Sequence, residues 1–212
     1  MTSPAPADDH PETSDHLTLV VIDMQHVFAD PGSPWAAPRF AEITPVVTRL
    51  IERFAPNVVL TRFIAPENPT GAWVKYYQQW PFALQPTEAA LWRLVPELEP
   101  GEPGQPGQPG QPGQPGQLGR AGQFPVIDRP SFGKWGPELR AALAGSTGLV
   151  LCGVSTDCCV LSTALPAADD GIAVQVVADA CAGATDADHQ RALAAMALYA
   201  PLITIITEAD LP

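Results

Sequence analysis

Residues 153–162 read Gly-Val-Ser-Thr-Asp-Cys-Cys-Val-Leu-Ser and follow an apolar run, Gly148–Gly153, that predicts a buried strand ended by glycine. Ser155 or Thr156 is a suitable N-cap, so we expect a helix to begin here with Cys159 in its first turn. Amides at a helix N-terminus favour a thiolate and can hydrogen-bond an oxyanion. The stretch indicates either a nucleophilic cysteine or an unreactive one buried in an α/β core.

A carboxylate ends the first apolar run of the chain. Leu17–Asp23 reads Leu-Thr-Leu-Val-Val-Ile-Asp, and its β-branched residues are typical of a strand covered on both faces. Open α/β sheets place their sites at the carboxyl ends of parallel strands. Asp23 is therefore expected to lie in a functional site.

The rest of the chain alternates strands with helices. This alternation predicts a mostly parallel sheet with helices on both faces. Strands are expected at 17–23, 57–62, 124–129, 148–153, 172–178 and 202–207, and helices at 39–54, 88–98, 136–144, 156–170 and 186–197.

Two motifs, Val-Val-Ile-Asp-Met-Gln at 20–25 and Gly-Val-Ser-Thr-Asp-Cys-Cys-Val at 153–160, resemble those of the isochorismatase-like cysteine hydrolases. This superfamily includes nicotinamidases and N-carbamoyl amidohydrolases, and the resemblance runs from about Leu17 to about Thr207. It implies a three-layer αβα fold with a six-stranded sheet in the order 3-2-1-4-5-6. The hydrolase domain is then expected to span residues 17–212.

The resemblance also implies roles for particular residues. The family pattern places the nucleophile at Cys159 and leaves Cys158 in a variable position, while Asp23 becomes the general base. Backbone N–H groups of Ser155 and Cys159 would form the oxyanion hole, with a non-proline cis bond between Val154 and Ser155. The implied reaction is cleavage of a C–N bond in a small amide, lactam or ureido compound through a thioester acyl-enzyme.

The cation of the site departs from the family pattern. Family members carry a lysine at the end of the third strand, and Arg129 stands at the matching position of Arg-Pro-Ser-Phe-Gly-Lys-Trp, residues 129–135. We expect Arg129 to pair with Asp23, and Lys134, five residues on, is the alternative. An arginine there would lower the basicity of the carboxylate.

No metal or other cofactor is expected. Nicotinamidase-type relatives bind a metal through an Asp-x-His cluster and a further histidine after the second strand, but residues 61–70 contain no histidine. His26, just after Asp23, is interpreted as a loop residue that could line the entrance.

Aromatic residues crowd the stretch 73–82, which has little helix or strand periodicity. They could wall a substrate pocket or seal a subunit interface, and family members are commonly homo-oligomers. The residues expected to line the pocket are Trp35, Trp73, Tyr77, Trp80, Phe132 and Trp135.

Charge and cysteine content limit the partners. The formal net charge of −12, from 23 acidic and 11 basic side chains, disfavours nucleic acid and anionic membranes and suits a neutral or cationic small substrate. The four cysteines lack the spacing of a zinc site or of a small secreted scaffold, so a cytoplasmic location is expected. Residues 1–16 are interpreted as a disordered acidic tail without signal-peptide features.

Glycine recurs at every third position between Gly101 and Gly119, and proline precedes most of these glycines. The repeat is too short for a free triple helix and is interpreted as a flexible surface insert. Replacing it with a short Gly-Ser linker is expected to leave the melting temperature nearly unchanged. A large fall in that temperature would show that the insert packs on the domain.

Two other functions stay open from the sequence. One is a vinyl-ether hydrolase of the isochorismatase type, although such members characteristically lack the nucleophilic cysteine that Cys159 would supply. The other is a catalytically silent binding protein on the same fold, which the unusual Arg129 keeps open.

Overall fold

The computed structural model describes residues 17–98, 124–143 and 145–211, so the expected tail at 1–16 and the insert at 101–119 lie outside the described residues. Six parallel strands form one sheet in the order β3-β2-β1-β4-β5-β6, which confirms the predicted topology. The strands are β1 (Leu17–Ile22), β2 (Val58–Phe63), β3 (Val126–Arg129), β4 (Gly148–Val154), β5 (Ala173–Ala182) and β6 (Ile203–Ile206).

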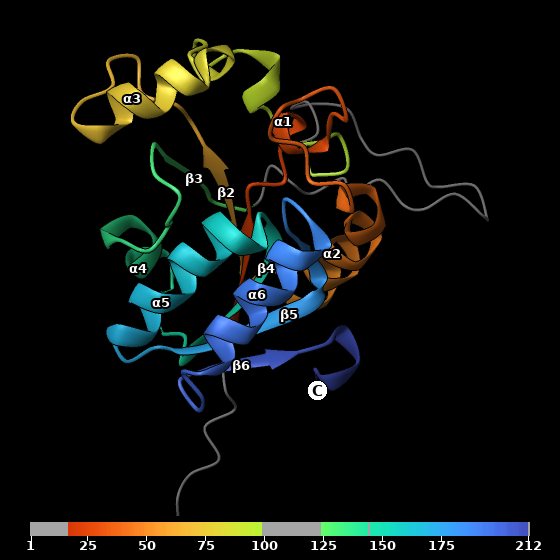
Figure 1. Cartoon of the computed structure of the whole chain (residues 1–212). Helices are drawn as coiled ribbons and strands as arrows, with labels where there is room; N and C mark the ends of the chain where they lie inside the picture. The colour runs from red at the N-terminus through yellow and green to blue at the C-terminus, as the bar shows by residue number, and fades with distance from the viewer. Residues whose placement is uncertain (1–16, 99–123, 144, 212) are drawn as a thin grey trace, which may run out of the picture.

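The helices form the two outer layers. Figure 1 shows α4, α5 and α6 along one face of the sheet and α2 on the other, as right-handed crossovers in a sheet of this order require. The helices are α1 (His26–Ala29), α2 (Phe40–Phe54), α3 (Ala72–Gln79), α4 (Pro137–Ala142), α5 (Leu161–Asp169) and α6 (Asp186–Ala197). None of the helices in the described part of the chain is long and apolar enough to cross a membrane.

The two central strands bring the two motifs together. In β1 and β4 Ile22 lies opposite Gly153, so the residues that follow each strand leave the sheet side by side. Gly153 has φ +104°, and a Cβ there would lie 2.1 Å from the carbonyl oxygen of Ile22. Only glycine fits this close approach of the two backbones.

The predicted helix at 88–98 is wrong. This segment contains only a short 3₁₀ turn, Ala90–Trp92, then Leu94 bridged to Gln25, and a turn at 96–98. The Gln25 side chain is buried; it donates to the carbonyl oxygens of Phe63 (3.0 Å) and Trp92 (2.7 Å) and accepts from the Phe63 amide (2.8 Å). The apolar pattern of the segment therefore indicates burial against the loop after β1, not helix.

A helix that the sequence did not predict, α3, follows β2. In Figure 1 it stands above the carboxyl ends of β2 and β3, at the edge of the sheet where the motifs meet. Its aromatic side chains therefore lie over the part of the fold where a site is expected.

Candidate active site

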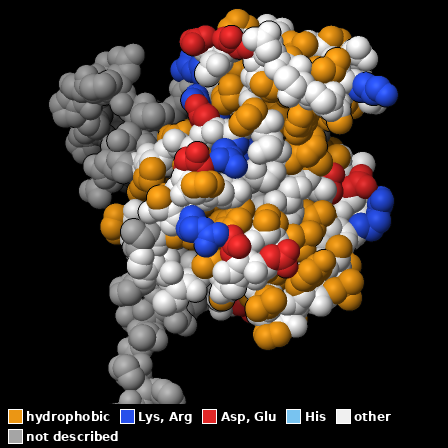
Figure 2. Space-filling model, turned by 90° about the vertical axis from the view of Figure 1, so that its left-hand side faces the viewer, with side chains coloured by type: hydrophobic (Ala, Val, Ile, Leu, Met, Phe, Trp, Pro, Cys, Tyr) orange, Lys and Arg blue, Asp and Glu red, His pale blue; other side chains and the backbone are white. Residues whose placement is uncertain are grey.

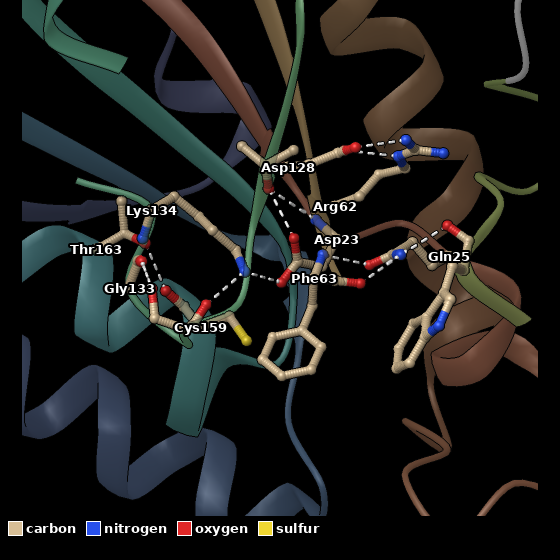
Figure 3. Close-up of polar contacts among 12 residues, drawn as sticks. Asp23, Gln25, Arg62, Phe63, Asp128, Gly133, Lys134, Cys159 and Thr163 are labelled. Carbon is tan, nitrogen blue, oxygen red and sulfur yellow. Dashed lines mark hydrogen bonds and ion pairs between the residues drawn. The ribbon is translucent and has the colours of Figure 1, made fainter. Parts of the chain in front are cut away.

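A buried ion pair lies at the carboxyl end of β1. The Lys134 ammonium is 2.8 Å from Oδ2 of Asp23, and both side chains have no exposed surface. Figure 3 shows the lysine reaching across to the carboxylate, with the Cys159 side chain beside the pair. A charge pair so fully removed from water is costly unless each member finds further partners.

Thr61 in β2 supplies such a partner, and sequence reasoning missed it. Its hydroxyl donates to Oδ1 of Asp23 at 2.7 Å and accepts from the Asp23 amide at 3.2 Å. Asp23 has φ +50°, a conformation that aspartate tolerates better than most residues. Thr61 therefore fixes both the backbone and the carboxylate of Asp23, and its position at the end of a neighbouring strand was the only signal available.

Thr61→Val is expected to lower the free energy of unfolding by about 1.5 to 3 kcal/mol, because the buried carboxylate loses a charge-assisted hydrogen bond while side-chain volume is kept. Denaturant unfolding followed by circular dichroism measures the change. Thr204→Val, at an exposed threonine of β6, is the matched control and should change stability by less than about 0.5 kcal/mol. Equal stability of the Thr61 variant and the native protein would contradict a structural role for this contact.

The loop after β3 holds Lys134 in place. The ammonium also donates to the Ser131 carbonyl at 2.9 Å and lies 5.1 Å from the centre of the Phe63 ring. The Lys134 amide donates to the Thr163 hydroxyl at 2.9 Å. Gly133 permits this path, since a Cβ there would lie 2.5 Å from the Ser162 carbonyl oxygen.

Cys159 lies in a π-helical turn, Thr156–Val160, that leads from β4 into α5. Its side chain is 2 % exposed, and Thr163 donates to its carbonyl oxygen at 2.6 Å. Thr163 thus links the turn that carries the thiol with the loop that carries Lys134, a contact that no sequence pattern predicts. The expected cis bond between Val154 and Ser155 is confirmed.

Electrostatics keep the Cys159 thiol protonated at rest. Burial raises the pKa of this thiol well above its usual range, the charge of Asp23 raises it further, and the charge of Lys134 lowers it. Burial therefore outweighs the thiolate-favouring effect expected at a helix N-terminus. The resting centre holds one negative charge, one positive charge and one neutral thiol.

Cys158 has a different environment. It is half-buried, and burial together with the charge of Asp157 raises the pKa of its thiol. The charge of Lys134 lowers the pKa of Cys158, but Asp23 is not among the groups that shift it, whereas both Asp23 and Lys134 act on Cys159. Of the two adjacent cysteines, only Cys159 is influenced by both charges of the ion pair.

The expected pairing of Arg129 with Asp23 is wrong. Arg129 forms an ion pair with Glu138 of α4 at 2.6 Å, and its side chain is 25 % exposed. β3 is an edge strand whose side chains alternate in exposure, and Arg129 extends along Gly136 toward α4 instead of into the site. Figure 2 shows acidic and basic side chains next to one another on this side of the molecule. Lys134, the alternative cation, occupies the position beside Asp23.

Most of the expected aromatic residues form one cluster near the ion pair. Trp35 lies 5.7 Å from Phe63, 6.3 Å from Trp80 and 6.0 Å from Tyr76 between ring centres. Phe132 lies 5.2 Å from Trp73. We call this group the aromatic cluster; its members are Trp35, Phe63, Trp73, Tyr76, Tyr77, Trp80, Phe82, Trp92 and Phe132.

Trp135 does not belong to the aromatic cluster, and its expected place in the pocket is wrong. Its indole N–H donates to Asp170, and the guanidinium of Arg140 lies 5.1 Å from its ring centre. Its side chain therefore packs between Arg140 of α4 and Asp170, the residue that follows α5.

The residues present do not fit the metal site of nicotinamidase-type proteins. In the described ranges 17–98, 124–143 and 145–211, no group of three or more His, Cys, Asp and Glu side chains is arranged to hold a metal ion. His189 is instead buried, with Nδ1 2.9 Å from the Thr156 hydroxyl. His26 lines an open hollow of about 600 Å³ with Phe82 and Arg93, and this hollow does not include Asp23, Lys134 or Cys159.

Comparison with known proteins identifies the same family that the sheet order implies. The family model described as the isochorismatase domain matches residues 18–208. A curated relative, isochorismatase domain-containing protein 2 of Xenopus laevis, is 41% identical over 71 residues, which make up 32% of this chain and 35% of that protein. The match therefore spans about a third of the relative's length.

Two solved structures are similar in fold. A cysteine hydrolase from Pseudomonas syringae pv. phaseolicola has a TM-score of 0.72 at 18% identity, with 99% of this chain and 96% of that chain covered. The pyrazinamidase of Pyrococcus horikoshii, solved in complex with zinc, has a TM-score of 0.66 at 24% identity, with 91% and 99% covered. Because the family model covers most of the chain and the sheet order is the one this family implies, the protein belongs to the isochorismatase-like hydrolase family.

Proposed function

We propose that the protein is a cysteine hydrolase that cleaves a C–N bond of a small amide, lactam or ureido compound. The observation that carries this proposal is the buried Asp23–Lys134 ion pair beside the enclosed Cys159 thiol. Pairing an acceptor for the thiol proton with a fixed cation gives the centre the groups that nucleophilic catalysis by a thiol requires. The structurally similar pyrazinamidase of Pyrococcus horikoshii is, by its name, an amidase.

Acylation begins with the neutral thiol. Asp23 accepts the Sγ proton of Cys159 as sulfur bonds to the substrate carbonyl carbon, and the carbonyl π electrons move to oxygen. Backbone N–H groups of Ser155 and Cys159 in the turn after β4 stabilise that oxyanion. When the tetrahedral intermediate collapses, the C–N bond breaks, the protonated Asp23 gives its proton to the leaving nitrogen, and a thioester remains on Cys159.

Deacylation uses the same carboxylate. Asp23 takes a proton from a water molecule that attacks the thioester carbonyl, and the second tetrahedral intermediate releases the acid. The departing sulfur recovers its proton from Asp23. The centre then returns to the neutral thiol and the Asp23–Lys134 pair.

Lys134 compensates charge during these steps. Its charge lowers the pKa of the Cys159 thiol, against the effects of burial and of Asp23. When the proton moves from sulfur to Asp23, the ammonium remains beside the developing negative charge. A fixed cation in a site without solvent stabilises such charge far more than it would in water.

The proposed reaction uses no metal, since the side chains around Asp23 offer no suitable ligand set among the described residues. The placement of Lys134 beside Asp23 supports catalysis over a silent binding protein, and Cys159 favours amide over vinyl-ether hydrolysis. A small neutral or cationic substrate, a homo-oligomeric state and a cytoplasmic location remain predictions.

Alkylation by iodoacetamide tests the thiol directly. Because burial raises the pKa of Cys159, its thiolate fraction, and hence its alkylation rate, is expected to increase steadily from pH 6 to pH 9. Peptide mapping by mass spectrometry assigns the label to Cys159 or Cys158, and the buried Cys152 and Cys181 serve as internal controls. A Cys159 that remains unlabelled at pH 9 while Cys158 reacts would contradict the proposal.

A further inference from the structure

The first turn of α6 packs against the π-helical turn that carries Cys159. The helix runs beside α5, which continues from that turn (Figure 1). The loop that joins β5 to α6 comes so close that a Cβ on Gly183 would lie 2.9 Å from Oδ1 of Asp157 and 2.9 Å from the His189 amide nitrogen. Because any larger side chain would collide with both, glycine at this position lets the start of α6 reach the turn.

Two polar contacts join the start of α6 to this turn. Oδ1 of Asp157 accepts from the Ala184 amide at 2.9 Å and also from the Ser155 hydroxyl. Deeper in the fold, Nδ1 of His189 lies 2.9 Å from the Thr156 hydroxyl. Thr156 has no exposed surface and His189 is 4 % exposed, so this second contact is removed from solvent. Its loss would leave two buried polar groups without a partner, which water could not easily replace.

The His189 side chain is neutral at neutral pH. Burial lowers its pKa from the usual value and the charge of Arg39 lowers it further, while the charges of Asp186 and Asp157 raise it. A neutral imidazole presents either a proton or a lone pair at Nδ1, and a threonine hydroxyl can match both. The contact therefore needs no proton uptake, and the reaction proposed above makes no use of this imidazole.

Thr156 is the first residue of the turn that presents the reacting thiol. Cys159 follows three residues later, and within the turn the Ser155 carbonyl oxygen accepts from the Val160 amide at 3.1 Å. That backbone bond holds the turn together, whereas the contact with His189 ties its first residue to a separate element. Such a tie matters for a reaction, because a displacement of about 1 Å can lower a rate by about 100-fold.

We propose that His189 is a positioning residue, which acts through the Thr156 hydroxyl to hold the Cys159 thiol at the buried ion pair. This assignment rests on the proposed hydrolysis at Cys159, and it gives the imidazole no proton to transfer. Loss of the contact lets the first residue of the turn move relative to α6, so that Cys159 loses its alignment with Asp23. The half-buried Cys158 does not depend on that alignment and serves as an internal reference in the same turn.

Substitutions at Thr156 test the contact from the side of the turn. Iodoacetamide is the probe, and peptide mapping gives the labelling rates of Cys159 and Cys158 separately at pH 8. Thr156→Val removes the hydroxyl but keeps the side-chain volume; it is expected to slow labelling of Cys159 roughly tenfold and to leave labelling of Cys158 within about twofold. Thr156→Ser keeps a hydroxyl and should label Cys159 within about threefold of the native rate.

A matched pair of substitutions tests the contact from the side of α6. The amide group of asparagine can place a polar atom where Nδ1 of His189 lies, whereas that of glutamine reaches toward the position of Nε2. His189→Asn should therefore keep the labelling rate of Cys159 within about threefold, and His189→Gln should slow it as much as Thr156→Val does. The double change Thr156→Val with His189→Gln should be within about twofold of either single change, because all three remove one contact.

A role in stability alone would give a different result. A loosened fold would expose the buried Cys152 and Cys181 and speed their labelling together with that of Cys159. Thr204→Val, at an exposed threonine of β6, is the control and should react like the native protein.

The proposal is overturned if Thr156→Val and His189→Gln label Cys159 at the native rate or faster. It is also overturned if labelling of Cys158 slows equally, or if the double change multiplies the two single effects. A Cys159 that does not react in the native protein would instead contradict the hydrolase reaction on which the proposal rests.

Discussion

Cys159→Ala is expected to lower the hydrolysis of small amides by at least about 10⁴-fold, because it removes the thiol on which both Asp23 and Lys134 act and which is proposed to form the thioester. Release of ammonia from a panel of primary amides and ureido compounds measures the loss. The substitution removes only a sulfur atom from the turn, so the melting temperature should change little compared with the change in rate.

Cys158→Ala is the matched control, since it makes the same chemical change one residue earlier. This variant should keep most of the hydrolytic rate, because Asp23, the proposed base, acts on Cys159 and is not among the groups that act on Cys158. Equal loss of activity in the two variants would show that the whole turn, not one thiol, matters for the reaction. Such a result would contradict the assignment of Cys159 as the nucleophile.

Lys134→Ala is expected to have the largest effect on stability. It leaves the Asp23 carboxylate buried without its cation, a change that typically costs about 3 to 5 kcal/mol. For a domain of this size, the loss corresponds to a fall in melting temperature of roughly 6 to 20 °C, which differential scanning calorimetry measures. Hydrolysis should be lost as well, because no positive charge then compensates the negative charge of Asp23 and of the reacting sulfur.

Two further variants separate the role of Lys134 from that of Arg129, and the effect on stability from the effect on activity. Arg129→Ala should change stability by no more than about 1 kcal/mol and leave hydrolysis intact, since it breaks only a partly exposed pair with Glu138. The double change Asp23→Asn with Lys134→Gln should recover much of the stability lost in Lys134→Ala, because both charges are removed together. It should not recover activity. A stable, active Lys134→Ala protein would refute the role given to this lysine.

The positions of Asp23 and of the cysteine turn could be predicted from the sequence because each follows a strand with an unambiguous apolar pattern, whereas the sheet order and the choice of Cys159 were implied by the resemblance to the family. Strand order then fixes the neighbours: Ile22 lies opposite Gly153, and the residues after them meet. These relations depend on short, regular segments and on the parallel topology. They do not require knowledge of how distant loops fold.

The cation could not be predicted in the same way. Aligning Arg129 with the family lysine assumes that the loop after β3 keeps one path, but the path here depends on Gly133 approaching the Ser162 carbonyl and on Thr163 holding the Lys134 amide. Both contacts join segments about 30 residues apart in the sequence. A position-by-position comparison does not contain that information.

The two errors in helix prediction have a common cause. The segment at 88–98 has apolar residues because Trp92, Leu94 and Val95 are buried in a 3₁₀ turn and the irregular chain after it, and α3 has no clear apolar stripe because its rings contact loops instead of the sheet. Periodicity reports which side chains are buried, and it predicts a helix only when the burial is one-sided. Near this site, tertiary contacts decide the local structure.

Trapping the acyl-enzyme is the most direct test of the account. Protein mixed with a hydrolysed amide is quenched with acid during turnover, and its intact mass and peptide map are measured. The account predicts an added acyl group on the peptide that contains Cys159, removed by neutral hydroxylamine as a thioester is, and absent from Cys159→Ala. Turnover with no acyl group on Cys159, or with the group on Cys158, would contradict the account.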